Sequence, residues 1–309
     1  MVFDRLSKKI HELKSPICVG LDTRYDYLPD DLKTELDYNK PFKTIAKNIL
    51  RFNKMIIDEI FDIVPCVKIQ IACYEMYGYN GLKTFQKTIE YARKKGMIVI
   101  ADAKRNDIGS TAAAYSAAFL GGVEVAGRIH HAFDADILTV NPYLGTDGIK
   151  PFLDDMGKTG KGIFVLVKTS NPSSGEFQDK ICEGKKNYMH IAEMVNEWGK
   201  EFIGRSGYSC VGAVVGATYK EQAEEIREKY KNMFFLIPGY GAQGATGDDI
   251  AVSFEDNGGG AIVNSSRGIL LAYKNKGYQN LTFDLAARAA ALDMKEDILV
   301  SLKKRNVTL

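Results

Sequence analysis

The feature that most constrains the fold of this chain is a series of short apolar runs spread along its whole length. Each run has the length of a β-strand, is rich in Val, Ile and Phe, and lacks a clean alternation of apolar and polar residues. Strands that are buried on both faces of a parallel sheet have this pattern, because neither face meets water. The eight runs are Ile17–Leu21, Val64–Ile71, Met97–Ala103, Asp136–Val140, Gly162–Lys168, Cys210–Gly216, Met233–Ile237 and Gly260–Asn264.

Apolar residues spaced three and four apart occupy the stretches between these runs. The spacing is clear over Phe42–Ile60, Leu82–Ala92 and Ile191–Phe202, and a shorter leading helix is expected over Phe3–Leu13. Each such helix would pack one apolar face on the sheet. Ser110 is the expected N-cap of the helix that follows the third strand.

Eight strands that alternate with helices over about 250 residues predict an α/β fold of the (β/α)8 TIM-barrel class. The competing fold is an open, doubly wound sheet. We expect a single domain over residues 1–309, with loop insertions at 23–41 and 171–186, since no linker, repeat or low-complexity segment is visible.

Composition narrows the class of protein further. The net charge of +2 is too small to indicate nucleic-acid or membrane-surface binding. The five cysteines include no C-x-x-C pair, which favours a reducing compartment over a disulfide framework. The first ten residues lack a signal-peptide apolar region, and no run of about 18 apolar residues exists. We therefore expect a cytoplasmic enzyme or binding protein.

Polar residues directly after the expected strands are the candidates for chemistry, because barrel enzymes have their active site at the C-terminal ends of the strands. They are Asp22, Lys68 within the second strand, the segment Asp102–Asp107, the segment Lys168–Asn171, the loop Pro238–Gly244 and the segment Asn264–Gly268.

The D-x-K-x-x-D pattern of Asp102, Lys104 and Asp107 is the sharpest of these signals. Asp102 and Lys104 are two residues apart at the end of a strand, so their side chains should point to the same side. A lysine flanked by carboxylates keeps its proton, because nearby negative charge favours the ammonium form. A surface cluster of ion pairs is the alternative, but the position directly after the apolar run MIVIA favours a site.

The loop Pro238–Gly244 contains G-x-G-x-x-G, the spacing of a dinucleotide fingerprint, but it follows the seventh strand instead of opening an early βαβ unit. A phosphate cradle is the better interpretation, since loops after strands seven and eight of barrels often bind phosphate. Glycine lets the backbone approach closely there, and Arg267 could add a forked donor. The alternative is that Arg267 is an ordinary surface arginine.

No metal site is expected. His130 and His131 are adjacent and would diverge on a helix, and the nearby Asp134 and Asp136 have no recognised ligand spacing. We expect no cofactor either, since no cofactor motif other than the misplaced glycine pattern is visible.

The segment Ala101–Tyr115, ADAKRNDIGSTAAAY, closely resembles the signature of the orotidine 5′-phosphate decarboxylases, with Asn106 where the signature has glycine. Other marks of that family follow in order from the first strand to the eighth. They are GLD at Gly20–Asp22, VKIQ at Val67–Gln70, PGYGAQG at Pro238–Gly244 and NSSRGI at Asn264–Ile269. TVNPYLG at Thr139–Gly145, VKTSNP at Val167–Pro172 and VVGAT at Val214–Thr218 resemble the branch with chains of roughly 300 residues.

The resemblance implies an activity and a set of roles. The reaction is conversion of orotidine 5′-phosphate to UMP and CO2 without a cofactor, with Lys104 as the proton donor to pyrimidine C6. Asp102 and Asp107 flank Lys104, and Lys68 completes an alternating charge array. The implied substrate contacts are Asp22 and Lys68 for the ribose, Ile108 and Thr111 for the neighbouring site, Ser170 for the pyrimidine, and Gln243, Ser266 and Arg267 for the phosphate, with Pro238 shaping the pocket. In this family Asp107, Ile108 and Thr111 act across a homodimer interface.

Two other functions remain open at this point. One is a magnesium-dependent decarboxylase or aldolase of the same barrel group that acts on sugar phosphates, because such relatives share D-x-K-x-x-D. Lys68 stands where a metal site after the second strand would need a carboxylate. The other is a nucleotide-binding barrel without catalysis, although simple binding would not need an intact charge array.

Overall fold

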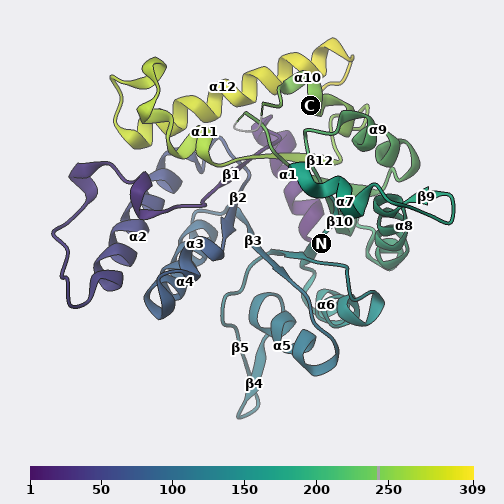
Figure 1. The fold of residues 1–309 in the computed structure, drawn as a ribbon, viewed down its shortest axis with the longest axis horizontal. Helices are drawn as coiled ribbons and strands as arrows, with labels where there is room; N and C mark the ends of the chain where they lie inside the picture. The colour runs from purple at the N-terminus through teal and green to yellow at the C-terminus, as the bar shows by residue number, and fades with distance from the viewer. Residues whose placement is uncertain (242–243) are drawn as a thin grey trace.

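The computed structural model describes residues 1–241 and 244–309 and contains the closed barrel that the apolar runs predict (Figure 1). Eight parallel strands close in the order β1-β12-β11-β10-β7-β6-β3-β2. Their bounds are β1 Ile17–Gly20, β2 Cys66–Gln70, β3 Ile98–Arg105, β6 Ile137–Val140, β7 Gly162–Lys168, β10 Ser209–Val215, β11 Met233–Pro238 and β12 Ala261–Ser265. The barrel is confirmed and the open sheet is excluded.

Helices surround the barrel in the expected alternation. The longer ones are α1 Val2–Leu13, α2 Pro41–Ile60, α4 Gly78–Lys94, α5 Gly109–Phe119, α6 Thr146–Thr159, α8 Asn187–Gly199, α9 Lys220–Lys229 and α12 Phe283–Lys304. The short ones are α3 Ala72–Glu75, α7 Gly175–Gln178, α10 Gly247–Ile250 and α11 Arg267–Leu270. The expected helix over Ile191–Phe202 ends at Gly199, and Lys200–Phe202 continues as a 3-10 turn.

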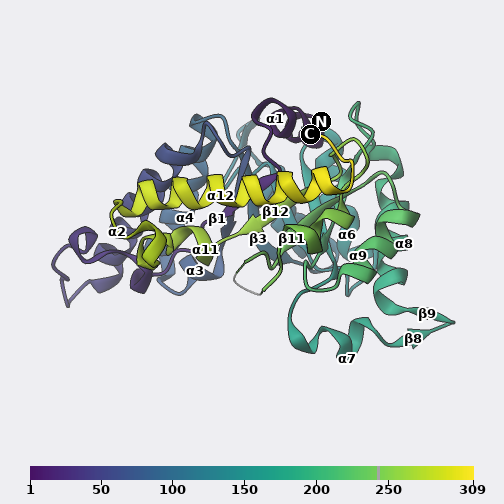
Figure 2. The same cartoon turned by 90° about the horizontal axis from the view of Figure 1, so that it is seen from above.

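Helix α1 closes one end of the barrel and leaves the other end for a site. The ring of Phe3 packs on Phe164 of β7 and Phe234 of β11, with centroid distances of 5.1 and 5.0 Å. The amide of Val2 donates to Gly160, just before β7 begins. Figure 2 shows α1 at one end of the barrel and α7 at the opposite end. The C-terminal ends of the strands therefore form the open face.

The two segments expected as insertions contain short regular elements. Residues 23–41 hold the 3-10 turns Tyr25–Tyr27 and Asp30–Leu32 before α2. Residues 171–186 hold the 3-10 turn Pro172–Ser174, α7, and a hairpin of β8 Ile181–Cys182 and β9 Lys185–Lys186.

Two sequence predictions about the region between β3 and β6 need correction. Ser110 is not an N-cap: α5 begins at Gly109, so Ser110 lies within the first turn, and Ile108 precedes the helix. His130 belongs to a hairpin of β4 Val123–Val125 and β5 Arg128–His130, and the sequence pattern does not predict this hairpin. Short exposed strands bury little apolar surface and leave a weak pattern.

Candidate active site

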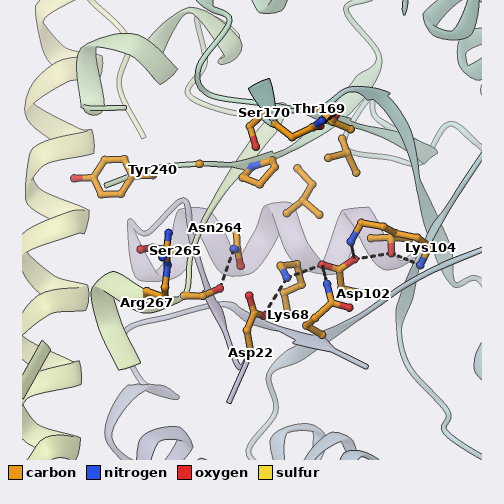
Figure 3. Close-up of a pocket in the computed structure, with 18 of the residues that line it drawn as sticks. Asp22, Lys68, Asp102, Lys104, Thr169, Ser170, Tyr240, Asn264, Ser265 and Arg267 are labelled. Carbon is orange, nitrogen blue, oxygen red and sulfur yellow. Dashed lines mark hydrogen bonds and ion pairs between the residues drawn. The ribbon is translucent and has the colours of Figure 1, made fainter. Parts of the chain in front are cut away.

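A cavity of about 750 Å³ opens at the C-terminal ends of the barrel strands. Eight of the residues predicted for the site line it: Asp22, Lys68, Asp102, Lys104, Ser170, Pro238, Ser266 and Arg267. Figure 3 shows the charged residues along one wall, Arg267 and Ser265 at one end, and Thr169 and Ser170 on the opposite wall. Side chains from the first, second, third, fifth, seventh and eighth barrel strands thus converge on one space.

Four of these side chains form a continuous chain of opposite charges. Lys68 Nζ donates to Asp22 Oδ1 at 3.3 Å and to Asp102 Oδ2 at 2.7 Å. Lys104 Nζ donates to Asp102 Oδ1 at 2.6 Å. The two carboxylates and two ammonium groups therefore alternate along the cavity wall, in the order Asp22, Lys68, Asp102 and Lys104 (Figure 3).

The charges in the middle of this array are buried and hold one another ionised. Burial alone would raise the pKa of Asp102, but the ammonium groups of Lys68 and Lys104 lower it well below its usual range. Burial alone would lower the pKa of Lys68, but Asp102 and Asp22 raise it above its usual range. Gln70 Nε2 and the Thr139 hydroxyl also donate to Asp102, at 3.0 and 2.9 Å. Asp102 is therefore a carboxylate at neutral pH.

An irregular backbone, and not the regular alternation of strand side chains that the sequence predicted, brings Lys104 to the array. The pairing of β3 with β6 shifts register between Ala101 and Arg105, and Lys104 has a φ of 48°. Such an irregularity bends a strand and re-aims its side chains. The contact between Asp102 and Lys104 is present, but this irregular backbone produces it.

The other end of the cavity has the residue types of an anion site. Ser265 ends β12, Ser266 follows it, and Arg267 begins α11. Among the described residues, Arg267 makes no ion pair or side-chain hydrogen bond, and its side chain is exposed at the cavity. Gln243, the remaining residue predicted for phosphate, lies outside the described residues.

The glycines of the loop after β11 are required by backbone conformation. Gly239, Gly241 and Gly244 have φ values of 106°, 69° and 90°, which side chains disfavour. A Cβ at Gly241 or Gly244 would meet no atom of the described residues within 4 Å. The positive φ therefore explains these glycines, and the close approach to a phosphate that we expected stays a prediction.

A glycine in the first strand makes room for the anion end. A Cβ on Gly20 would lie 1.9 Å from Ser266 Oγ and 2.9 Å from Ser266 Cβ, which is impossible without moving Ser266. The GLD and NSSRG segments, 244 residues apart in the chain, therefore fit together only because residue 20 has no side chain.

The segment that follows β7 holds Thr169, the residue directly before Ser170. Gln178 Oε1 accepts from the amide of Thr169 at 3.0 Å, and Gln178 Nε2 donates to its hydroxyl at 2.7 Å. Lys168, a candidate by position, is fully buried and instead pairs with Asp179 at 2.8 Å, outside the cavity lining. Lys168 thus anchors residues 171–186 over the barrel.

Three predicted residues stand apart from this cavity. In the part of the chain that the structure describes, the lining does not include Asp107, Ile108 or Thr111. Asp107 Oδ1 accepts from the amide of Ile108 at 2.8 Å, and Ile108 is 57% exposed. In this single chain these residues do not complete the array.

The structure adds residues to which the sequence analysis gave no individual role. Asn264 is buried at the cavity between the charge array and Ser266, and its Oδ1 has no partner among the described residues. Thr139 and Gln70 contact Asp102 directly. Their position at strand ends was the available signal, but Thr, Asn and Gln are common at such places and are therefore a weaker signal than charged residues.

A cysteine nucleophile and a metal site have less support than the charge array at the open end of the barrel. Burial raises the pKa of the Cys73 thiol to about 11, so this cavity-lining cysteine is a poor nucleophile at neutral pH. Among residues 1–241 and 244–309, no group of three or more His, Cys, Asp and Glu side chains is arranged to hold a metal ion.

Comparison with known proteins gives a consistent result. The model of the orotidine 5′-phosphate decarboxylase / HUMPS family matches residues 15–278. An orotidine 5′-phosphate decarboxylase of Clostridium acetobutylicum is 45% identical over 303 residues, covering 98% of this chain and 100% of that protein. One from Petrotoga mobilis is 46% identical over 300 residues, covering 96% and 98%.

A solved structure agrees with these sequence relatives. The crystal structure of a putative orotidine 5′-phosphate decarboxylase from Streptomyces avermitilis superposes with a TM-score of 0.76 at 31% identity, covering 97% of this chain and 95% of that one. The matches span the barrel from its first strand to its last. This chain belongs to the orotidine 5′-phosphate decarboxylase / HUMPS family.

Proposed function

We propose that this chain is a carboxy-lyase that converts orotidine 5′-phosphate to UMP and CO2, a step of pyrimidine nucleotide synthesis. The observation that carries the proposal is the hydrogen-bonded array of Asp22, Lys68, Asp102 and Lys104 in the same cavity as Ser266 and Arg267. The array lies at one end of the cavity, and Ser266 and Arg267, which are suited to binding an anion, lie at the other. A nucleotide with a reacting base and a distal phosphate requires this arrangement.

Lys104 is placed to supply the cation and the proton that the reaction needs. The bond between C6 and the carboxylate carbon breaks, CO2 leaves, and the electron pair stays on C6. The ring offers no site that can take up this charge. A fixed ammonium group beside C6 stabilises it as it develops, and one N–H proton of Lys104 is then transferred to C6. The Lys104 side chain is 45% exposed, so it can reach a ligand while it contacts Asp102.

Asp102 and Lys68 hold this cation in place. Because Lys68, Gln70 and Thr139 also donate to Asp102, its carboxylate is fixed and stays charged. Lys104 is thus oriented before the substrate arrives, which avoids reorganisation during the reaction. At the far end, Ser266 and Arg267 would bind the phosphate, and that binding energy orients the base.

Lys68 weighs against the magnesium-dependent alternative. Its ammonium group occupies the place between Asp22 and Asp102 where a divalent cation bound by both carboxylates would lie. A metal there would have to displace a buried, doubly paired lysine.

We also propose that the enzyme is a homodimer in which Asp107, Ile108 and Thr111 complete the partner's site. Helix α5 has no charged residue, and Ala113 and Ala114 on it are exposed. The neighbouring hairpin exposes Val123, Val125 and Ile129, each to more than half of its surface. Exposed apolar surface of this kind supports an interface here.

For location, we propose the cytoplasm, which the five free thiols support. Among the described residues, no helix has the length and apolar character needed to cross a membrane.

The test of the proposed reaction is an ultraviolet assay with orotidine 5′-phosphate on protein freed of metal by a chelator. We expect undiminished turnover to UMP. Activity that disappears on chelation and returns with magnesium would favour the sugar-phosphate relatives, and tight UMP binding without turnover would favour a binding module.

A further inference from the structure

The backbone around Lys104 contains two more residues than its neighbouring strand can pair. On β6, Leu138 pairs with Ala101 and Val140 pairs with Arg105, so Thr139 alone stands opposite Asp102, Ala103 and Lys104. Such a bulge leaves amide N–H groups of the longer strand without strand partners. Backbone N–H groups that lose their strand partner need another acceptor, from a side chain or from water.

The hydroxyl of Thr139 is that acceptor. Thr139 Oγ1 accepts from the amide of Ala103 and from the amide of Lys104, both at 3.0 Å. The same hydroxyl donates its hydrogen to Asp102 Oδ1 at 2.9 Å. Thr139 is 1% exposed and lines the cavity. One buried oxygen therefore binds three consecutive residues of the catalytic segment.

This arrangement matters because Lys104 is in a strained conformation. Its φ of 48° lies in the left-handed region, which is costly for a residue with a side chain and persists only when the surroundings enforce it. The bond to the Lys104 amide fixes that backbone, and the bond to Asp102 fixes the carboxylate that Lys104 contacts at 2.6 Å. The same hydroxyl thus fixes the backbone that carries the Lys104 side chain and the carboxylate that its ammonium group contacts.

We propose that Thr139 is a positioning residue for the decarboxylation: its hydroxyl holds the bulge that directs the Lys104 ammonium group at the reacting carbon. The inference rests on the proposed function for its kinetic consequence, but the hydrogen bonds themselves do not depend on the substrate. Thr139 acts through Asp102 and Lys104 and forms no bond with the reacting atoms.

The test compares two substitutions that differ in one group. Thr139→Val keeps the size and removes the hydroxyl, whereas Thr139→Ser keeps the hydroxyl and removes the methyl. We expect Thr139→Val to lower kcat by on the order of 10²-fold, the effect of a displacement of about 1 Å at a catalytic group. UMP affinity should change little, and Thr139→Ser should stay within about threefold of wild-type kcat.

A matched control separates positioning from stability. Thr84 is also buried, and its hydroxyl donates to a backbone carbonyl, that of Ala46, but it lies on α4 outside the cavity lining. Thr84→Val should lower the melting temperature without lowering the kcat of the folded protein. Equal kcat losses for Thr139→Val and Thr139→Ser, or none for Thr139→Val, would overturn the proposal.

Amide hydrogen exchange provides a readout that needs no substrate. The amides of Ala103 and Lys104 should exchange slowly in wild type and Thr139→Ser, and much faster in Thr139→Val. Slow exchange in Thr139→Val would show that the hydroxyl does not hold the bulge, even if orotidine 5′-phosphate were not the substrate. If Thr139→Val does not fold, Thr139→Ala replaces it in both measurements, because it also removes the hydroxyl.

Discussion

Replacing Lys68 by methionine tests whether the array is the coupled electrostatic unit that the structure shows. The Lys68 side chain is 6% exposed and the Asp102 side chain 8%, so the substitution leaves a buried carboxylate with one cation fewer. Removing one partner of a buried pair costs about 3–5 kcal/mol. Asp102 keeps the donors Lys104, Gln70 and Thr139, so we expect a loss of about 3 kcal/mol, at the lower end of this range.

This loss can be measured by thermal and denaturant unfolding. An unfolding entropy of roughly 2.1 cal/mol/K per residue over the 309 residues converts ~3 kcal/mol into a fall in Tm of about 5 °C. Lys185→Met is the matched control, because the pair of Lys185 and Glu193 is about half exposed. Pairs of that kind contribute roughly 0–1 kcal/mol, so its Tm should hardly move.

The double variant Lys68→Met/Asp102→Asn isolates the cause. If the loss comes from an uncompensated buried charge, removing that charge should recover part of the stability. The reasoning is refuted if Lys68→Met costs no more than Lys185→Met, or if adding Asp102→Asn only deepens the loss.

The pH dependence of the same difference has a definite sign. The pKa of Lys68 is raised above its ordinary 10.5, so its contribution is complete below pH 10.5 and is lost as the pH rises further. The pKa of Asp102 is lowered below its ordinary 3.8, so its contribution is complete above pH 3.8 and is lost as the pH falls further. The difference in stability between wild type and Lys68→Met should therefore be flat between these limits and shrink outside them.

Three further predictions concern function. Arg267→Ala should lower kcat/KM for orotidine 5′-phosphate by a factor that corresponds to roughly 2–4 kcal/mol, and should barely change kcat/KM for orotidine, which lacks the phosphate. Equal losses on both substrates would mean that Arg267 does not bind phosphate. Gly20→Ala should raise KM for the nucleotide, because its Cβ displaces Ser266; an unchanged KM would contradict this. Co-expressed Lys104→Ala and Asp107→Ala subunits should recover about a quarter of wild-type activity, since half the dimers then have one intact site; an isolated heterodimer as inactive as its parents would exclude the shared site.

The barrel was predictable because its strands are buried on both faces. All seven residues of β10 are buried, and the sequence from Cys210 onward is a continuous apolar run. Strand β7 begins and ends at the predicted residues. The polar residues at strand ends could be predicted for the same reason: once the strands are located, topology alone brings Asp22, Lys68 and Asp102 to one face.

The details of backbone geometry were not predictable in this way. A register shift depends on which amides find acceptors, and the acceptor Thr139 lies 35 residues from Lys104 in the chain. The conformation of Lys104 likewise reflects tertiary hydrogen bonds, since no local preference of lysine favours a positive φ. The resemblance implied that Asp107 belongs to the site. In the single chain, the cavity lining among the described residues does not include Asp107. Its role can therefore be tested only in a dimer.

The central claim is that Lys104, held by Asp102, is the group that makes decarboxylation possible without a metal. The most direct measurement is kcat for orotidine 5′-phosphate with Lys104→Ala and wild-type protein, both freed of metal, together with the affinity of each for UMP. The account predicts a fall in kcat on the order of 10³-fold or more with the fold and UMP binding retained, because the lost cation acts where charge develops. A kcat near that of wild type would contradict it.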